Sequence, residues 1–463
     1  VIRICQMVEG MPLGIELAAA WLKALPPQQI VRELERGLDI LTARLQNIPA
    51  RHRSMRVVMD HSWSLLAEEE QTVAARLSVF SGGFQAEAAA EVAGASLPML
   101  ATLVEKAWVR VTPDRRYQMH ELTRQYAAER LADTASAIRD AHAAYYAALV
   151  ERQSAHLYSP AYKQGLAVVS AELDNVRHAW QWLIDAVSQQ RERLPVTSLF
   201  RQLARVLTTY YLFNSLWLAG QALFDQAIQV MEAAGWGAHH GDGAMQHDQL
   251  STLVQVRLCT GLFHFEIGQY RASLAVAKEA IPVCRAYNLE HDLALALLLY
   301  GRTQLRRGVS ADATATLQEA MALCRRLGDT SGHAEALLSL GMVASAQGRY
   351  TEAQAYLHEA LALCKDMGYR PWVSRALTSL GTTYSRQHDY RHALPYYKQA
   401  LTIAQEEGDQ NQIMVLTSNL GGVERGFGRY QVSETYYNQS LALARSLGDE
   451  RWIAANLNGI AIS

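Results

Sequence analysis

The chain has 463 residues, half of them apolar, and a formal net charge of −2 at pH 7. This length is too great for one hydrophobic core, so several domains are expected. The small net charge excludes an overall electrostatic attraction to nucleic acid or membranes, and no apolar run approaches the ~18 residues that a membrane-spanning helix needs, so we expect a cytoplasmic protein without a membrane partner.

Residues 1–48 are predicted to form a helical domain. Residues 10–14 (Gly-Met-Pro-Leu-Gly) lead into an alanine-rich helix that extends to Lys23, and Pro26-Pro27 begins a second helix that extends to about Leu45. Taken alone, Pro12 is simply a proline that starts a helix.

Residues 49–132 carry a short β signal after several helices. Residues 108–112 and 117–119 alternate apolar and polar side chains on either side of a polar turn that contains Arg115 and Arg116. This combination is typical of a winged-helix domain. Its expected recognition helix, residues 97–106, is mostly apolar with one lysine, whereas a helix that enters a DNA groove needs several cationic or amide side chains. We therefore predict a packing role rather than DNA binding.

Residues 133–250 are predicted to be a helical linker with degenerate repeats. Trp217, Gly220 and Ala227 copy the spacing that Tyr350, Ala353 and Ala360 show in a regular repeat, so a degenerate repeat is expected to begin near residue 199. The glycine- and histidine-rich stretch 235–243 is interpreted as a solvated loop rather than a metal site, because dense glycine does not provide a rigid set of ligands.

Residues 251–463 repeat with a period of 40. Gly261, Gly301, Gly341, Gly381 and Gly421 keep this step, and so do Cys284, Cys324 and Cys364, which we assign to core packing. Small residues 12 and 19 positions after each glycine mark the crossing of two antiparallel helices. In the turns between units, glycine supplies a left-handed residue and aspartate begins the next helix, as at Gly408-Asp409. Such units bury their apolar faces against each other and form a superhelix with a concave surface.

The repeat phase also predicts a ligand-binding surface. In each 40-residue unit, the first of the two helices is expected to line the concave side. Its polar residues there are Arg302, Arg306, Glu335, Arg375, Thr378, Thr382, Ser385, Arg386, Ser418 and Arg425. Arginines outnumber carboxylates there, which favours an acidic peptide, a phosphorylated ligand or a carboxylate. A solvated helix face without a ligand is the alternative.

This pattern resembles the tetratricopeptide repeat, whose small-residue positions match Gly341, Ala353 and Ala360, with a longer turn in place of the usual proline. The expected fold class is therefore predominantly all-α: an α-solenoid of tetratricopeptide-like repeats, preceded by a helical domain and a winged-helix domain with a small β-hairpin. The resemblance implies a peptide, a protein or a small molecule as the partner of the concave face.

A second resemblance covers most of residues 1–185. The segments 10–13, 61–66, 76–84, 117–127 and 172–180 resemble, in order, the bacterial signal-transduction ATPases with numerous domains (STAND). The resemblance implies a preceding nucleotide-binding domain that binds ADP or ATP. Pro12 matches the proline that lies against adenine, and His120 matches the histidine of a Met-His-Asp motif that contacts the β-phosphate of ADP, although Glu121 replaces the aspartate.

Catalytic motifs are missing from the sequence itself. No G-x-x-x-x-G-K-[ST] motif occurs, so we expect this chain to hold no cofactor and not to be an enzyme on its own. The sequence begins at Val1 and ends at Ser463, inside a further repeat, and we expect both ends to be cuts in a longer protein.

Two functional hypotheses follow. The first is the regulatory and sensor portion of a STAND switch: ADP bound between the nucleotide-binding domain and His120 keeps the protein closed, and a ligand on the repeats shifts it to an open form that can oligomerise. The alternative is a constitutive scaffold or adaptor whose repeats bind a partner protein without a nucleotide switch. A Walker motif encoded upstream of Val1 would favour the first hypothesis.

Overall fold

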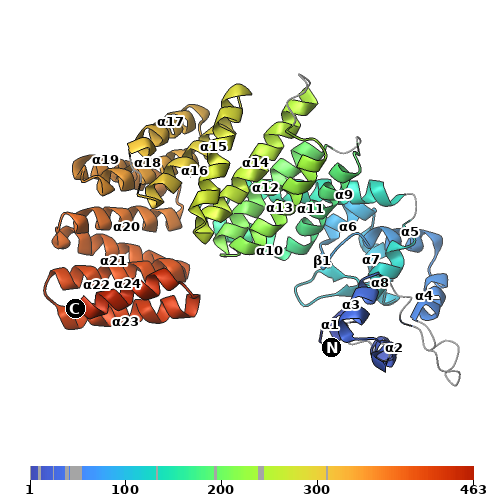
Figure 1. Cartoon of the computed structure of the whole chain (residues 1–463). Helices are drawn as coiled ribbons and strands as arrows, with labels where there is room; N and C mark the ends of the chain where they lie inside the picture. The colour runs from blue at the N-terminus through green and yellow to red at the C-terminus, as the bar shows by residue number, and fades with distance from the viewer. Residues whose placement is uncertain are drawn as a thin grey trace. The chain divides into compact units, whose positions relative to one another are not determined.

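The computed structural model describes residues 2–8, 12–23, 25–36, 41, 55–131, 134–191, 195–237, 244–308 and 311–462 (Figure 1). The chain divides into two compact units: unit 1 comprises Val1–Arg152 and Val168–Leu203, and unit 2 comprises Gln153–Ala167 and Ala204–Ser463. Helices dominate both units, as predicted. The finer division at residues 48, 132 and 250 stays a prediction.

Unit 1 begins with the helices expected near the N-terminus. They are α1 (Ile2–Met7), α2 (Pro12–Ala20), which a 3-10 turn extends to Lys23, and α3 (Pro27–Arg36). Pro12 and Pro27 each occupy the first helical position, where a missing N–H leaves no hydrogen bond unmade. The side chain of Pro12 lies outside the described residues. The same holds for residues 37–45 except Leu41, so the predicted end of the second helix near Leu45 is outside them too.

The predicted β-hairpin follows in unit 1. Arg110 lies opposite Gln118 and Val111 opposite Tyr117, so β2 (Arg110–Val111) and β3 (Tyr117–Gln118) are antiparallel. A third strand that the sequence did not indicate, β1 (Gly83–Phe84), pairs with the other side of β3. Helices surround this sheet: α4 (Met55–Ser64), α5 (Glu68–Leu77), α6 (Ala86–Ala93), α7 (Leu97–Glu105) and α8 (Glu121–Ala128).

Longer helices continue the chain. They are α9 (Ala135–Ser154), α10 (Tyr162–Ala171), α11 (Leu173–Ser188) and α12 (Val196–Phe213). Trp180 of α11 is fully buried and meets Phe200 edge-on, with the ring centroids 4.9 Å apart. This contact anchors the core at the end of unit 1.

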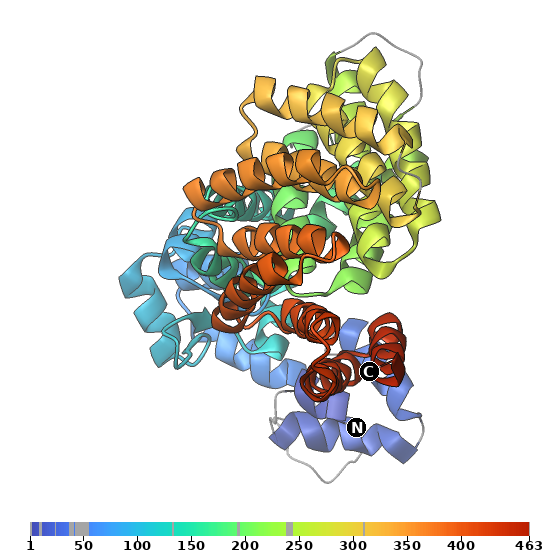
Figure 2. The same ribbon diagram turned by 90° about the vertical axis from the view of Figure 1, so that its left-hand side faces the viewer.

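Unit 2 is an array of antiparallel helix pairs, seen from two directions in Figures 1 and 2. Each helix packs against the next one in the chain. The helices are α13 (Trp217–Ala233), α14 (Ala244–Ile267), α15 (Tyr270–Ala286), α16 (Glu290–Arg306), α17 (Ala311–Leu327), α18 (Thr330–Ala346), α19 (Tyr350–Asp366), α20 (Arg370–Arg386), α21 (Tyr390–Glu407), α22 (Gln410–Gly426), α23 (Tyr430–Leu447) and α24 (Glu450–Ile462).

The periodic glycines lie where the two helices of a pair cross. A Cβ atom added to Gly341 would come within 2.5 Å of Leu357 Cγ, and one added to Gly301 within 2.4 Å of Leu317 Cγ. The turns also follow the sequence prediction: Gly408 has a φ of 74°, and Asp409 caps α22 by accepting a hydrogen bond from the Gln412 N–H at 3.0 Å. The 40-residue period therefore corresponds to one helix pair.

Two pairs carry the same ion pair with the charges exchanged. In the α16–α17 pair, Glu290 at the start of the first helix bonds Arg326 at the end of the second, at 2.8 Å. In the α20–α21 pair, 80 residues later, Arg370 occupies the first position and bonds Glu406 in the second. The same end of the two helix pairs is thus held by an ion pair whose positive and negative residues have changed places.

Among the described residues, no single helix has the length and apolar character to cross a membrane. The pair Ala86–Ala93 and Leu97–Glu105 meets that criterion jointly, but its two helices are bent by 103°.

Candidate functional site

The first helix of each repeat pair lies on the inner side of the array. Besides packing against its own partner, each of α14, α16, α18, α20 and α22 contacts the next first helix directly. Elements on the inner side of a curved array approach each other more closely than those outside. Side chains from successive first helices can therefore meet.

Three of the predicted residues do meet there. Glu335 of α18 lies between two arginines: its Oε1 is 2.7 Å from Nη1 of Arg302 on α16 and 3.6 Å from Nη1 of Arg375 on α20. Arg302 also reaches Glu266 of α14 at 3.4 Å, and its guanidinium lies 4.4 Å from the ring centroid of Phe265. We call Arg302, Glu335 and Arg375 the arginine cluster.

The arginine cluster combines burial with an excess of positive charge. Arg302 is 9% exposed, and its Nε atom is buried without a hydrogen-bond partner. Burial and the neighbouring Arg302 lower the pKa of Arg375. Arg306 lies 5.9 Å from the same Phe265 ring, so three arginines face two glutamates. An anionic group would satisfy both the free donor and the uncompensated charge.

The other predicted ligand-binding residues make different contacts. The Thr382 hydroxyl donates to the Thr378 carbonyl at 2.9 Å and accepts from the Tyr397 hydroxyl at 3.1 Å. Arg425 lies 6.0 Å from the Tyr437 ring centroid, and Arg386 is exposed. The structure therefore brings Arg302, Arg306, Glu335 and Arg375 together, and it connects Thr382 and Arg425 to helices of their own repeats.

Sequence reasoning missed an aromatic group beside the arginine cluster. Tyr158 comes from the connection between α9 and α10, and Tyr162 is the first residue of α10. They contact Phe213, Tyr369 and Trp372 in the same unit. One signal was present: position 369 carries tyrosine where the equivalent turns have Asp329, Asp409 and Asp449. Tyr369 makes no side-chain capping hydrogen bond.

In unit 1, the structure places His120 at the start of α8. Its Nδ1 atom accepts a hydrogen bond from the Leu122 N–H at 3.2 Å, so the imidazole caps the helix. Glu121, in the place of the family's aspartate, forms a two-pronged ion pair with Arg124, with both distances 2.8 Å. Burial alone would raise the pKa of Glu121, but the Arg124 interaction outweighs it and holds the pKa below its usual range.

A cleft of about 380 Å³ lies between α1 and α8. It is lined by Arg3, Gln6, Met7, Glu121, Arg124 and Gln125. The lining combines two arginines with one glutamate, and Arg124 is paired with that glutamate. The structure does not test the roles predicted for Pro12 and His120 toward a nucleotide.

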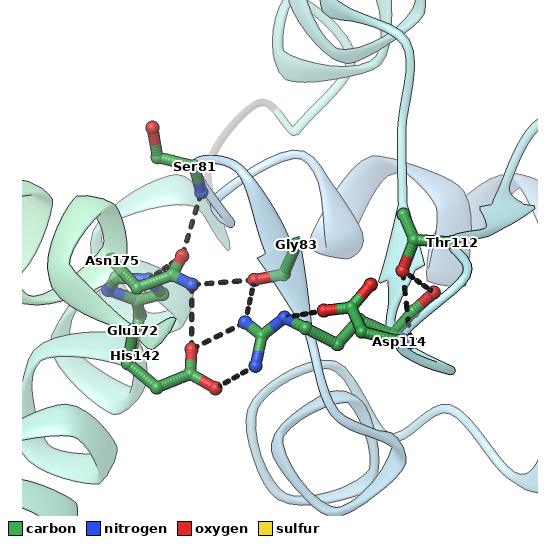
Figure 3. A network of polar contacts seen from close by, with 8 residues as sticks. Ser81, Gly83, Thr112, Asp114, His142, Glu172 and Asn175 are labelled. Atoms are coloured by element: carbon green, nitrogen blue, oxygen red, sulfur yellow. Dashed lines mark hydrogen bonds and ion pairs between the residues drawn. The ribbon is translucent and has the colours of Figure 1, made fainter. Parts of the chain in front are cut away.

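The basic turn of the hairpin is engaged within unit 1 (Figure 3). Arg116 Nη1 and Nη2 bond the two carboxylate oxygens of Glu172 at 2.5 and 2.9 Å, and both side chains are at most 8% exposed. Asn175 donates to Glu172 at 3.1 Å and to the Gly83 carbonyl at 2.9 Å. Arg116 is therefore buried in an ion pair that joins the sheet to Glu172, the residue that precedes the first turn of α11.

Comparison with known proteins places these features in context. The tetratricopeptide repeat model matches residues 332–406, and the model of anaphase-promoting complex subunit 5 matches residues 237–302 and 286–345. The crystal structure of a STAND protein with a tetratricopeptide repeat sensor from Pyrococcus horikoshii covers 96% of this chain, which covers 71% of that chain, with a TM-score of 0.50 and 14% identity.

Curated relatives match shorter parts. A Mycobacterium bovis protein, whose name assigns it to the HTH-type transcriptional regulators, is 34% identical over 195 residues, which is 39% of this chain and 22% of that protein. An uncharacterized protein of the same organism is 32% identical over 146 residues, 29% of this chain and 37% of its own length. The chain thus spans well under half the length of these relatives. Residues 332–406 match the tetratricopeptide repeat, and the fold of the chain is similar to that of a STAND protein with a repeat sensor.

Proposed function

We propose that this chain is the sensor and regulatory part of a STAND-type signalling switch. In this proposal the repeats bind an activating ligand or partner through an anionic group at the arginine cluster. The observation that carries the proposal is the position of Arg302: it is buried, has a free Nε donor, and shares Glu335 with a second arginine. A cluster built only for stability gains little from such an arrangement, because each buried charge loses hydration that the shared carboxylate does not replace.

The ligand test uses the full chain and native cell extract. We expect a specific bound species, identified by mass spectrometry, to be retained by the native chain and lost by Arg302→Gln/Arg375→Gln. The matched control is Arg285→Gln/Arg326→Gln, which removes two exposed arginines of the second helices α15 and α17. These arginines pair with Glu319 and Glu290. Retention by the cluster variant would move recognition to another surface and contradict the proposal.

The nucleotide part of the proposal concerns His120. In the intact protein, we propose that ADP lies between the nucleotide-binding domain and the cleft of α1 and α8, and that it keeps the protein closed. The support is that Arg3 lines that cleft near His120, and that a phosphate could take the place of Glu121 beside Arg124. Ligand on the repeats would then favour the open form, as a population shift requires a ligand that prefers it.

The nucleotide test must separate capping from nucleotide contact, because the His120 side chain also caps α8. His120→Asn keeps a capping side chain and removes the imidazole, whereas His120→Ala removes both. We expect both variants of the intact protein to retain less ADP and to show higher basal activity. Unchanged ADP content in His120→Asn would contradict the nucleotide role and favour the scaffold hypothesis.

A further inference from the structure

The segment from the end of α9 to the first turns of α10 belongs to the repeat array. Residues Gln153–Ala167 form part of unit 2, although the sequence on both sides belongs to unit 1. The segment carries the pattern Tyr158-Ser-Pro-Ala-Tyr162-Lys163. Two of the residues that it contacts, Tyr369 and Glu407, lie more than 200 residues later in the chain.

Aromatic contacts fix this segment to the start of α20. Tyr158 lies 5.5 Å from Tyr369 and 5.2 Å from Trp372, measured between ring centroids. Tyr162 lies 5.2 Å from Tyr369 and also 5.2 Å from Phe213. The two contacts with Tyr369 are edge-to-face, a geometry that adds to the burial of apolar surface.

The proline of the segment also has a fitted partner. Pro160 lies against Gly368 so closely that a Cβ atom on that glycine would be 2.5 Å from the proline Cγ. Gly368 also has a φ of 67°, which disfavours any other residue. The turn before α20 is thus shaped for this proline.

A buried carboxylate holds the end of the segment. The Tyr162 hydroxyl donates to Glu407 Oε2 at 2.5 Å, Lys163 Nζ lies 2.7 Å from the same oxygen, and Arg370 Nε lies 2.8 Å from Oε1. The Glu407 side chain is 9% exposed. Burial would raise the pKa of Glu407, but the hydrogen bonds from Lys163 and Tyr162 outweigh burial and lower the pKa.

The backbone of the segment is hydrogen-bonded to itself. The described bonds from the N–H groups of residues 156, 157, 159, 162, 164 and 165 all end on carbonyls between residues 153 and 161. The contacts with the array described above are made by side chains. The segment could therefore leave the array without exposing unpaired backbone groups in either partner, unlike a strand that is withdrawn from a sheet.

We propose that Tyr369, Trp372, Phe213 and Glu407 form a peptide-binding surface, and that residues 158–163 are its built-in, displaceable occupant. The partner that this surface fits is a peptide with two aromatic residues around a proline, followed by a lysine. This inference goes beyond the proposed function and does not depend on the arginine cluster or on a nucleotide.

The surface nevertheless adjoins that cluster. Burial and the charge of Glu335 raise the pKa of Tyr158. A change of occupant at the peptide-binding surface would therefore alter the surroundings of Glu335.

The first test measures binding in trans to the full chain. The probe is a fluorescent peptide with the sequence of residues 155–165. We expect it to bind Tyr162→Ala/Lys163→Ala, in which the internal occupant is weakened, at least tenfold more tightly than it binds the native chain, because a tethered occupant competes at a high effective concentration. Adding Glu407→Gln should abolish this gain. Equal affinity for the native and weakened chains, or no binding to the weakened chain, would overturn the proposal.

The second test measures displacement of the segment by hydrogen exchange. We expect Glu407→Gln to accelerate exchange of the amides at 155–163 about tenfold and to leave those of α20–α22 unchanged, because one side-chain anchor is lost. The matched control is Glu406→Gln: this exposed neighbour bonds Arg370, and its described contacts include none with the segment. Joint acceleration of the segment and α20–α22 would make the segment an integral part of the core and overturn the proposal, as would unchanged exchange.

Discussion

Removing Arg116 alone should destabilise unit 1 far more than removing the whole Arg116–Glu172 pair. Both side chains are at most 8% exposed, so Arg116→Met leaves a buried carboxylate whose described hydrogen-bond donor is Asn175 at 3.1 Å. Breaking a buried pair by removing one partner costs about 3–5 kcal/mol. We expect about 3 kcal/mol, because Asn175 still donates to Glu172 and to the Gly83 carbonyl.

The double variant Arg116→Met/Glu172→Met should recover to within about 1 kcal/mol of the native chain, because replacing both charges with apolar groups is close to neutral. Arg110→Met, on the exposed strand β2, is the control and should change stability by about 0.5 kcal/mol or less. Native-state hydrogen exchange in increasing urea measures the opening free energy of the hairpin and α11 separately from that of the array. If Arg116→Met were as stable as the control Arg110→Met, the reasoning that burial makes the Arg116–Glu172 pair costly to break would be refuted.

Three further predictions concern both units. Burial and neighbouring His178 lower the pKa of His142 to about 3, so the unfolded chain gains a proton that the folded chain does not as the pH falls below ~6.5. The contribution of His142 to stability is complete above that pH and should fall by up to ~1.4 kcal/mol per pH unit below it. His142→Phe should reduce this dependence in denaturation experiments and leave the part that comes from His178, whose pKa burial also lowers. Gly341→Ala forces a Cβ against Leu357 and should cost ~1–3 kcal/mol, whereas Gly422→Ala, whose Cβ would have 3.5 Å to its nearest neighbour, should raise the thermal midpoint. Asp409→Ala removes the cap of α22 and should cost about 1 kcal/mol, measured as faster amide exchange at its first turn.

Periodicity explains why so much of the array could be predicted. A repeat must return the same small residue to each crossing, so Gly341 and Ala353 locate the helices before any contact is known. The same phase placed Arg302, Glu335 and Arg375 on one face, and the structure brings them together. Phase alone could not show that Arg386 and Arg425 make no described contact with this cluster, because it does not specify how far neighbouring helices are displaced.

Contacts between distant, non-repeating segments could not be predicted in this way. Tyr162 and Glu407 are separated by 245 residues, and no pattern in the sequence connects them. Strand β1 has two residues, which is too short for alternation to be recognised. Arg116 appeared as a surface charge in a turn, and its burial depends on Glu172, 56 residues away.

The ion pairs Glu290–Arg326 and Arg370–Glu406, whose charges are reversed relative to each other, bear on how repeats of similar structure avoid pairing with the wrong helix during folding. Each pair is exposed and contributes little to stability, about 1 kcal/mol or less. If α16 docked on α21, however, Glu290 would face Glu406, and if α20 docked on α17, Arg370 would face Arg326. The charge at the end of each helix is therefore attracted by its own partner and repelled by the corresponding partner two units away. This difference favours assembly in chain order over exchange of helices between repeats or between copies of the chain.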